Sequence, residues 1–447
     1  MSASSRFLDG SLRYPSLKHL MFSLLLLCFA SDLFFSYFPI GPVPVRNYLW
    51  GLGLTLILLI WLLKASLYIR LGYPEKIILL LSVLGVTTTI LNVGLSLEVL
   101  VSLIRVLLIP YGIFVLATFV FNLSVSFVRL FIAAVVLLTA FSALIALLQW
   151  LNVGFAWELR QSMPASSDDI GSTLLNALNG RHRPYGMSYF PISLAYQVCW
   201  AFPLAWYVAE RSSNFPLFIR RLGAISALLL LLAVFASGTR SASIALIVQL
   251  IIIMWAKGYV SLRLRSVIPI VVVLSAVLIG VLYIQSDRWL LNDSSALSRY
   301  WLLYVGVLFI FDNPLGQGFD WSVYNAFKQS FLASSPFLDA SLAAEIRVNA
   351  PHNQFINTAI YYGWTGVLFV LAFYYWIIRK LFSISRETKL IQNYLPHALL
   401  AGFSGYLVNS MFHNAGLFVG DHLGWYFLAL SCWVIKKRTV LRVNSDT

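Results

Sequence analysis

Four short segments combine arginine or histidine with residues that start or bend helices, and these are the candidates for chemistry. The first, Arg181-His-Arg-Pro-Tyr-Gly186, precedes a helix that we expect to begin near residue 188. An arginine presents a planar, permanently charged fork that binds phosphate oxygens in pairs, and the free amides of a helix start also attract anions. The segment is therefore a candidate diphosphate cradle, with anchoring among lipid headgroups as the alternative.

The second segment, Ser237-Gly-Thr-Arg-Ser241, lies between two long apolar runs. A charged side chain costs roughly 2–3 kcal/mol at the centre of a bilayer, so an arginine inside a membrane usually pairs with an anion or binds substrate. The small neighbours permit close packing and a bend. Arg240 is thus a candidate substrate ligand, with snorkelling to the membrane surface as the alternative.

The third segment, Ala350-Pro-His-Asn-Gln-Phe355, closes a long polar stretch and opens an apolar run. Histidine titrates near neutral pH, so His352 can take a proton from an attacking hydroxyl. Pro351 and Asn353 suit the start of a helix, so helix capping is the competing interpretation.

The fourth segment is Met411-Phe-His-Asn-Ala-Gly416, followed by Gly420-Asp-His-Leu-Gly424. Its polar side chains His413, Asp421 and His422 can supply a second wall of a site. The alternative interpretation is a short polar turn between two helices, with no functional role.

The composition indicates that these segments are carried by membrane helices. Of 447 residues, 60% are hydrophobic and 11% are charged, and the mean hydropathy is +0.83. A soluble protein has about 25% charged residues, and an apolar run of about 20 residues crosses a bilayer as a helix. We expect an all-α polytopic protein in which residues 1–447 form one transmembrane domain. The three cysteines lack metal-ligand spacing, so neither a disulfide framework nor a metal site is expected.

About twelve runs are long enough to span. They lie near residues 18–40, 47–66, 77–95, 97–121, 127–151, 188–209, 222–238, 241–257, 266–286, 355–378, 393–412 and 422–436. If the N-terminus is cytoplasmic, most of the 31 Lys and Arg residues fall in cytoplasmic loops, as the positive-inside rule requires. This location of the positive charge argues against nucleic acid as a partner. Both termini are then cytoplasmic, and the four candidate segments share the outer face.

Two outer loops are long, at residues 152–187 and 287–354. In the second loop, residues 294–311 predict a short helix along the membrane surface, where Tyr300, Trp301 and Tyr304 suit the headgroup region. The turn from Asp312 to Gly318 should end it, because a proline and two glycines follow.

The sequence lacks GxxxxGK[ST], GxGxxG after a strand and HExxH, so nucleotide-driven chemistry is unsupported. An enzyme on the outer face has no ATP and must use a pre-activated substrate. A lipid-linked diphosphate sugar meets that need.

Residues 150–380 resemble the O-antigen ligase and O-antigen polymerase superfamily. The resemblance rests on Arg299-Tyr-Trp, Asn313-Pro-Leu-Gly-Gln-Gly318, Pro351-His-Asn-Gln-Phe355 and Tyr362-Gly-Trp-Thr-Gly366, with the first two segments above in the expected order. It implies a GT-C-like, metal-independent and inverting membrane glycosyltransferase that uses no cofactor. Such enzymes move glycan from undecaprenyl diphosphate at the periplasmic face of the bacterial inner membrane.

By this resemblance, Arg183 and Arg240 hold the diphosphate, and His352 activates or orients the acceptor hydroxyl. Further substrate contacts are expected from the residues that flank these motifs, namely Arg160, Arg181, Tyr185, Arg299, Asn353 and His413. The expected partners are an undecaprenyl-diphosphate-linked oligosaccharide, membrane lipid and a chain-length regulator protein.

A polymerase adds glycan to a lipid-linked repeat unit, whereas a ligase adds it to lipid A–core. Two spacings resemble a polymerase R-x10-G motif and its counterpart, Arg160 to Gly171 and His352 to Gly363, and they favour a polymerase. A flippase or other transporter of lipid-linked oligosaccharide is the alternative from another class. Such a protein would bury charges along a midplane cavity, whereas these spans are nearly free of charge.

Overall fold

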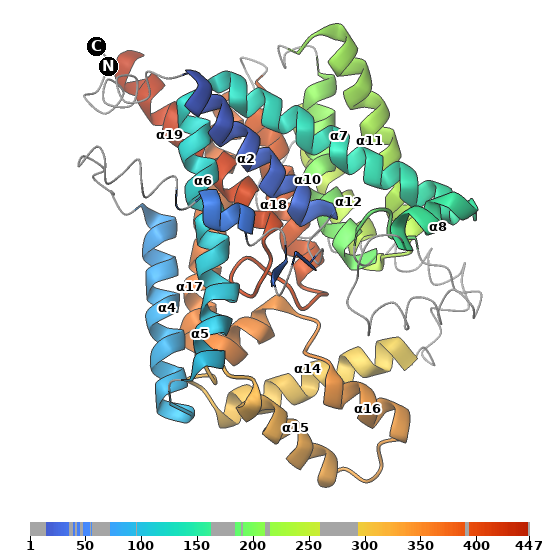
Figure 1. Ribbon diagram of the computed structural model, residues 1–447, viewed down its shortest axis with the longest axis vertical. Helices are drawn as coiled ribbons and strands as arrows, with labels where there is room; N and C mark the ends of the chain where they lie inside the picture. Colours follow the sequence, from blue (N-terminus) through green and yellow to red (C-terminus); the bar gives the residue numbers. More distant parts are fainter. Residues whose placement is uncertain are drawn as a thin grey trace.

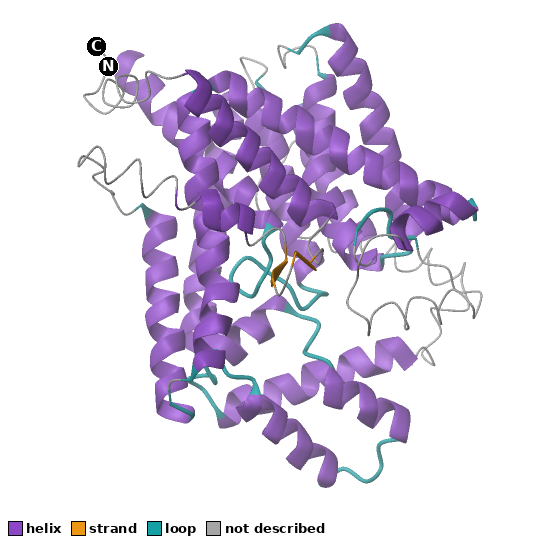
Figure 2. Ribbon diagram, viewed as in Figure 1, coloured by secondary structure: helices purple, strands orange, loops and turns teal. Residues whose placement is uncertain are grey.

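The structure is a computed structural model. It describes residues 15–34, 39–40, 43–44, 48–53, 55, 72–94, 96–161, 184–188, 191–210, 215–259, 294–388 and 393–445. Within these ranges the regular structure is helical, apart from the two-residue strands β1 (Pro39–Ile40) and β2 (Val43–Pro44), which pair antiparallel (Figure 2). The predicted all-α fold is confirmed.

Figure 1 shows how the elements are arranged. The helices are α2 (Pro15–Phe34), α4 (Tyr73–Asn92), α5 (Leu97–Leu103), the π-helical turn η1 (Ile104–Leu108), α6 (Ile109–Leu123), α7 (Val125–Trp150), α8 (Gly154–Gln161), α10 (Pro191–Ala209), α11 (Leu217–Ser237), α12 (Arg240–Ala256), α14 (Ser294–Asp312), α15 (Ser322–Ala333), α16 (Ala340–Val348), α17 (Gln354–Thr388), α18 (Leu395–Ser410) and α19 (Leu423–Ser445). The start of α2 and the end of α19 lie on one side of the bundle, and α14, α15 and α16 lie on the opposite side.

Seven of the described helices are long and apolar enough to cross a bilayer, so the chain is a multi-pass membrane protein. They are α2, α4, the continuous α5–η1–α6, α7, α10, α11 and α17. Helices α12, α18 and α19 coincide with three further expected spans. Of the other two expected spans, 47–66 lies mostly and 266–286 wholly outside the described residues.

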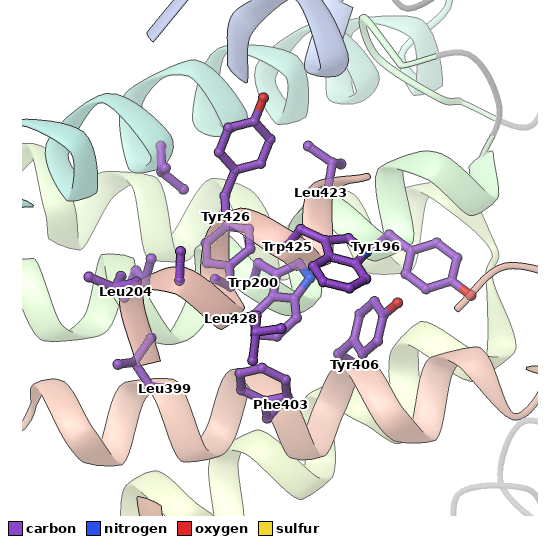
Figure 3. Packing of buried hydrophobic residues seen from close by; sticks show 14 of the residues in the cluster. Tyr196, Trp200, Leu204, Leu399, Phe403, Tyr406, Leu423, Trp425, Tyr426 and Leu428 are labelled. Atoms are coloured by element: carbon purple, nitrogen blue, oxygen red, sulfur yellow. The ribbon is translucent and has the colours of Figure 1, made fainter. Parts of the chain in front are cut away.

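The core of the bundle is aromatic and joins α10, α18 and α19 (Figure 3). Trp200 of α10 stacks on Phe427 of α19 with ring centroids 4.4 Å apart, and Phe403 of α18 meets it edge-on at 4.7 Å. Gly402 permits this approach, because a Cβ there would lie 3.0 Å from the Trp200 ring. Aromatic pairs in such geometries stabilise a core beyond the area they bury. The middle parts of α10 and α18 are thereby fixed relative to each other.

The loop at 287–354 contains more structure than the sequence predicts. Helix α14 ends at Asp312, as expected, but α15 and α16 follow it. Helix α16 starts at the N-cap Asp339, whose carboxylate accepts a hydrogen bond from Leu342 N at 2.7 Å. A separate small core joins the three helices, built from Leu302, Val305, Phe309, Ile310, Tyr324, Leu342 and Ile346. Trp301 packs near the Phe331 and Phe337 rings.

Helix α17 is broken at Gly363, whose φ is +66°, and a loop occupies the break. Gln317 N donates to Ile360 O at 2.7 Å, and Trp364 N donates to Pro314 O at 3.0 Å. A break inside a membrane helix frees backbone groups that need partners. The Asn313–Gly318 segment supplies them.

The same loop is fixed to α4. Phe319 N donates to Thr89 Oγ1 at 2.7 Å, and Asn92 Nδ2 donates to Gly316 O at 3.1 Å. Residues 313–319 and 360–364 are called the helix-break junction below. The junction brings together two glycine-containing motifs that are distant in the sequence, Asn313–Gly318 and Tyr362–Gly366. Backbone hydrogen bonds join the two segments.

Candidate active site

The start of α17 carries His352 in a fixed geometry. Asn353 caps the helix, because its Oδ1 accepts hydrogen bonds from Phe355 N at 2.8 Å and Ile356 N at 3.2 Å. Asn357 Nδ2 donates to Pro351 O at 2.8 Å and so closes the turn around His352. The capping role expected as the alternative for Asn353 is therefore real, and it fixes the backbone of His352.

His352 itself is half-buried, and its Nδ1 is buried without a hydrogen-bond partner in the described part of the chain. Burial, and after it the positive charge of Arg299, lowers the pKa of His352 to about 4. The imidazole is therefore neutral at physiological pH. A neutral imidazole can accept a proton, which is what a general base requires.

Helix α14 brings Arg299 to His352. Gly306 lies seven residues after Arg299, about two turns along the same face of α14. It contacts the start of α17, since a Cβ there would be 2.9 Å from Pro351 Cγ and 2.7 Å from Ile356 Cγ2. Only a residue without a side chain allows this approach. The close contact holds α14 across the start of α17 and places a cation beside the candidate base.

Arg240 is the first residue of α12. It follows Gly238, which ends α11 in the left-handed conformation with φ +58° and turns the chain between the two helices. Ser241 Oγ then donates to Asn409 Oδ1 at 2.8 Å and also lies 2.7 Å from His413 Nε2. Because a serine hydroxyl has one hydrogen to donate, His413 Nε2 must donate to Ser241 Oγ when Ser241 donates to Asn409.

The connection between α18 and α19 joins the two sides of the site. Asn353 Nδ2 donates to Met411 O at 3.0 Å, and Asn357 Nδ2 donates to Asn414 O at 3.0 Å. The same connection carries His413. Five side chains, Ser241, Asn353, Asn357, Asn409 and His413, are called the polar junction below. They link the segment of Arg240 to the segment of His352.

His413 lies inside this junction. It is 2% exposed, and its ring is 5.9 Å from that of Tyr196, whose hydroxyl donates to Ala415 O at 2.7 Å. The nearby acid Asp421 accepts hydrogen bonds from Tyr406 Oη at 2.7 Å and Gly424 N at 3.1 Å, and burial raises its pKa. His413 is thus a buried residue that positions Ser241 through their hydrogen bond. Asp421 caps the start of α19.

The Arg181–Gly186 segment is described only from Pro184 onward, and its end is fixed to α7. Tyr185 N and Gly186 N donate to Gln149 Oε1 at 3.0 and 2.9 Å. Tyr185 is buried, with its ring 5.7 Å from that of Trp157. The expected ligands Arg181 and Arg183 lie outside the described residues, as does the side chain of Arg160.

Two sets of residues were not singled out from the sequence. Asn357 and Asn409 are polar residues inside otherwise apolar helices, which is a signal that the sequence does contain. Lys328, which donates to Arg347 O at 2.9 Å, had no such signal. Among the described residues, no three His, Cys, Asp or Glu side chains form a cluster that could hold a metal ion.

Comparison with known proteins supports the resemblance. Residues 225–371 match a family model described as O-antigen ligase, and this range contains Arg240, Arg299, His352 and the helix-break junction. No curated protein matches the chain at a significant level. The family match supports a function of the O-antigen ligase or polymerase type. The match over residues 225–371 supports a relationship of this part of the chain to the O-antigen ligase and polymerase superfamily of glycosyltransferase-like enzymes.

Proposed function

We propose that the chain is a polymerase of O-antigen or another surface polysaccharide. It transfers glycan from undecaprenyl diphosphate to a lipid-linked repeat unit at the periplasmic face of the inner membrane. The observation that carries the proposal is the neutral imidazole of His352, held at the start of α17 beside Arg299. The polar junction ties that imidazole to the segment of Arg240.

The reaction follows from these groups. The acceptor hydroxyl oxygen attacks the anomeric carbon from the side opposite the diphosphate, and the bond from that carbon to the phosphate oxygen breaks. Undecaprenyl diphosphate leaves with the bonding electrons, and the hydroxyl proton passes to His352. The configuration at the anomeric carbon inverts. Fixed positive charges stabilise a leaving diphosphate in the transition state.

Arg240 and Arg299 are the described cations of this site, and Arg181 and Arg183 are proposed to complete it. A bound diphosphate would also raise the pKa of His352, because negative charge favours the protonated imidazole. The base would then be stronger with donor bound than in the free enzyme. The proton affinity of His352 would then be highest when the donor is bound, which is when the acceptor hydroxyl loses its proton.

An O-antigen ligase is the second candidate, and the match to the O-antigen ligase family favours it. The two candidates share the donor and differ in the acceptor. The spacing of His352 and Gly363, which resembles a polymerase motif, favours the polymerase. Gly363 is also the point at which α17 breaks.

Deletion of the gene, followed by gel analysis of lipopolysaccharide and of total surface polysaccharide, separates these candidates. A polymerase predicts core carrying a single repeat. A ligase predicts core alone, with long polyprenyl-linked glycan accumulating. Unchanged profiles of every surface polysaccharide would reject both candidates.

A further inference from the structure

Helix α17 folds back on itself, so that its start contacts its own second part. Tyr374 Oη donates to Gln354 Oε1 at 3.0 Å, although the two residues are 20 positions apart in the same helix. A straight α-helix would separate them by about 30 Å. The reversal occurs at Gly363, whose φ of +66° is a conformation that glycine adopts readily. The short arm of α17, residues 354–362, therefore returns along the long arm, residues 364–388.

The hydrogen bond between the two arms is buried and closely packed. Gln354 and Tyr374 are each 2% exposed, and the edge of the Phe355 ring meets the Tyr374 ring with centroids 6.2 Å apart. Gly416, in the connection between α18 and α19, permits this packing, because a Cβ there would lie 2.9 Å from Gln354 Cβ. A buried polar group that loses its partner is costly, so this bond favours the folded-back geometry.

The short arm carries His352 at the end that is far from the break. His352 lies two residues before Gln354, and the helix-break junction holds the opposite end of the arm at Gly363. The arm is about 12 Å long, so a rotation of about 5° at the break would move its far end by about 1 Å. A displacement of that size at a reacting group can cost about 100-fold in rate. The position of His352 therefore depends on what holds the start of the short arm.

Two attachments hold that start, and they act on different elements. Asn353 and Asn357 bond to the connection between α18 and α19, where residues 411–422 form turns. The hydrogen bond from Tyr374 attaches the arm instead to the long arm, which is a regular helix. Helices are more rigid than the segments that connect them. The bond to Tyr374 thus relates the start of the short arm to the more rigid of the two elements.

We propose that Gln354 is a positioning residue for the transfer reaction, because its hydrogen bond with Tyr374 sets the place of His352 relative to the acceptor hydroxyl. The inference rests on the proposed function, in which His352 is the base. Gln354 and Tyr374 are buried, so neither side chain contacts the substrate. Loss of their bond should therefore lower kcat and leave KM unchanged, as expected for an effect on the transition state alone.

Glycan extension in proteoliposomes tests this role, with purified undecaprenyl-diphosphate-linked repeat units as the substrate. Tyr374→Phe removes the hydroxyl and keeps the ring, and Gln354→Met removes the acceptor and keeps the length of the side chain. Each variant should lower kcat by about 10- to 100-fold, with KM unchanged. The double variant should lose no more than the larger single loss, because both substitutions break the same hydrogen bond.

Tyr375→Phe is the matched control, because Tyr375 is the next residue of the long arm and is exposed. It should keep the wild-type kcat. Amide hydrogen exchange at residues 352–358 is a readout that needs no activity, and it should become faster in Tyr374→Phe but not in Tyr375→Phe.

Equal exchange or equal kcat in Tyr374→Phe and Tyr375→Phe would overturn the proposal. A raised KM at unchanged kcat, or additive losses in the double variant, would also overturn it. If the wild type extends no glycan but exchange is faster in Tyr374→Phe, the attachment of the short arm stands. The catalytic role of Gln354 then falls together with the polymerase function.

Discussion

Ser241 Oγ lies 2.7 Å from His413 Nε2, and this contact joins two polar segments that are 172 residues apart in the sequence. Ser241 follows Arg240 directly at the start of α12. His413 lies two residues after Met411, whose carbonyl oxygen accepts a hydrogen bond from Asn353 Nδ2. A continuous path of hydrogen bonds and short backbone segments therefore connects the candidate phosphate ligand Arg240 with the candidate base His352.

Ser241→Ala should destabilise the protein. The substitution leaves two buried groups, Asn409 Oδ1 and the His413 ring, without the hydroxyl between them, at a cost of about 1–3 kcal/mol. Thermal unfolding of the purified protein measures the change. Ser330→Ala removes an exposed hydroxyl from α15 and should leave the melting temperature unchanged. Equal melting temperatures for both variants would contradict the role of the junction.

The pH dependence of transfer should report the low pKa of His352. Because that pKa is lowered to about 4, the base is neutral above pH 4 and is lost as the pH falls through that value. The acid limb of kcat/KM, which reports the free enzyme, should therefore fall near pH 4, not near the usual 6.5 of histidine. An acid limb at 6.5 would show that His352 is not the group that titrates.

Removing the charge of Arg299 should shift that limb. The cation beside His352 contributes to its lowered pKa, after burial, so Arg299→Gln should move the acid limb of kcat/KM to higher pH. Burial remains, so the limb should stay below 6.5. Arg347→Gln makes the same change at an exposed arginine of α16 and serves as the control. Identical profiles for the two variants would argue against an interaction between Arg299 and His352.

The helix-break junction should tolerate no side chain at Gly316. Its φ is +79°, and a Cβ would lie 2.6 Å from Gly363 N and 2.8 Å from Ile360 O. Gly94 has φ +80° with open space around it, so Gly94→Ala should cost only the conformational term of about 1–2 kcal/mol. Gly316→Ala should cost about 1–3 kcal/mol more, through displaced backbone. Denaturant unfolding of the two variants gives the difference, and equal losses would refute the interlock.

Lys328 should hold the chain that leads into His352. Its Nζ is buried and donates to Arg347 O at 2.9 Å and Asn349 O at 3.2 Å, at the end of α16. Lys328→Met leaves both carbonyls without this donor, so amide hydrogen exchange at residues 349–353 should become faster. Lys380→Met, at an exposed position of α17, provides the comparison. Unchanged exchange at 349–353 in Lys328→Met would exclude this role.

The elements that the sequence predicts well are those with long apolar runs. Helix α12 starts where expected, because a bilayer-length apolar run is a strong local signal. Helix α14 ends where expected, because a turn with a proline and two glycines follows it. Helices α15 and α16 are short, and their apolar residues matter only once they pack on α14. No local pattern specifies that packing, so α15 and α16 could not be predicted from the sequence.

The candidate site divides in the same way. Arginine, histidine and helix-start residues mark the segments of Arg240 and His352 in the sequence. The polar junction consists of side-chain hydrogen bonds between segments far apart, and these follow only from the packing of α12, α17 and α18. His413 is the residue whose expected role changes most. The sequence offers it as a substrate ligand, whereas its burial makes it a support for Ser241.

In the proposed reaction, the chain transfers glycan from a polyprenyl diphosphate with His352 as the base. The direct measurement is extension of purified undecaprenyl-diphosphate-linked repeat units in proteoliposomes that contain the wild type or His352→Gln. We predict a glycan ladder from the wild type. The extension rate of His352→Gln should be reduced by about 100-fold or more, since general-base catalysis contributes roughly 10²–10⁴-fold. A wild type that forms no ladder, or a His352→Gln variant that extends glycan at the wild-type rate, would contradict the account.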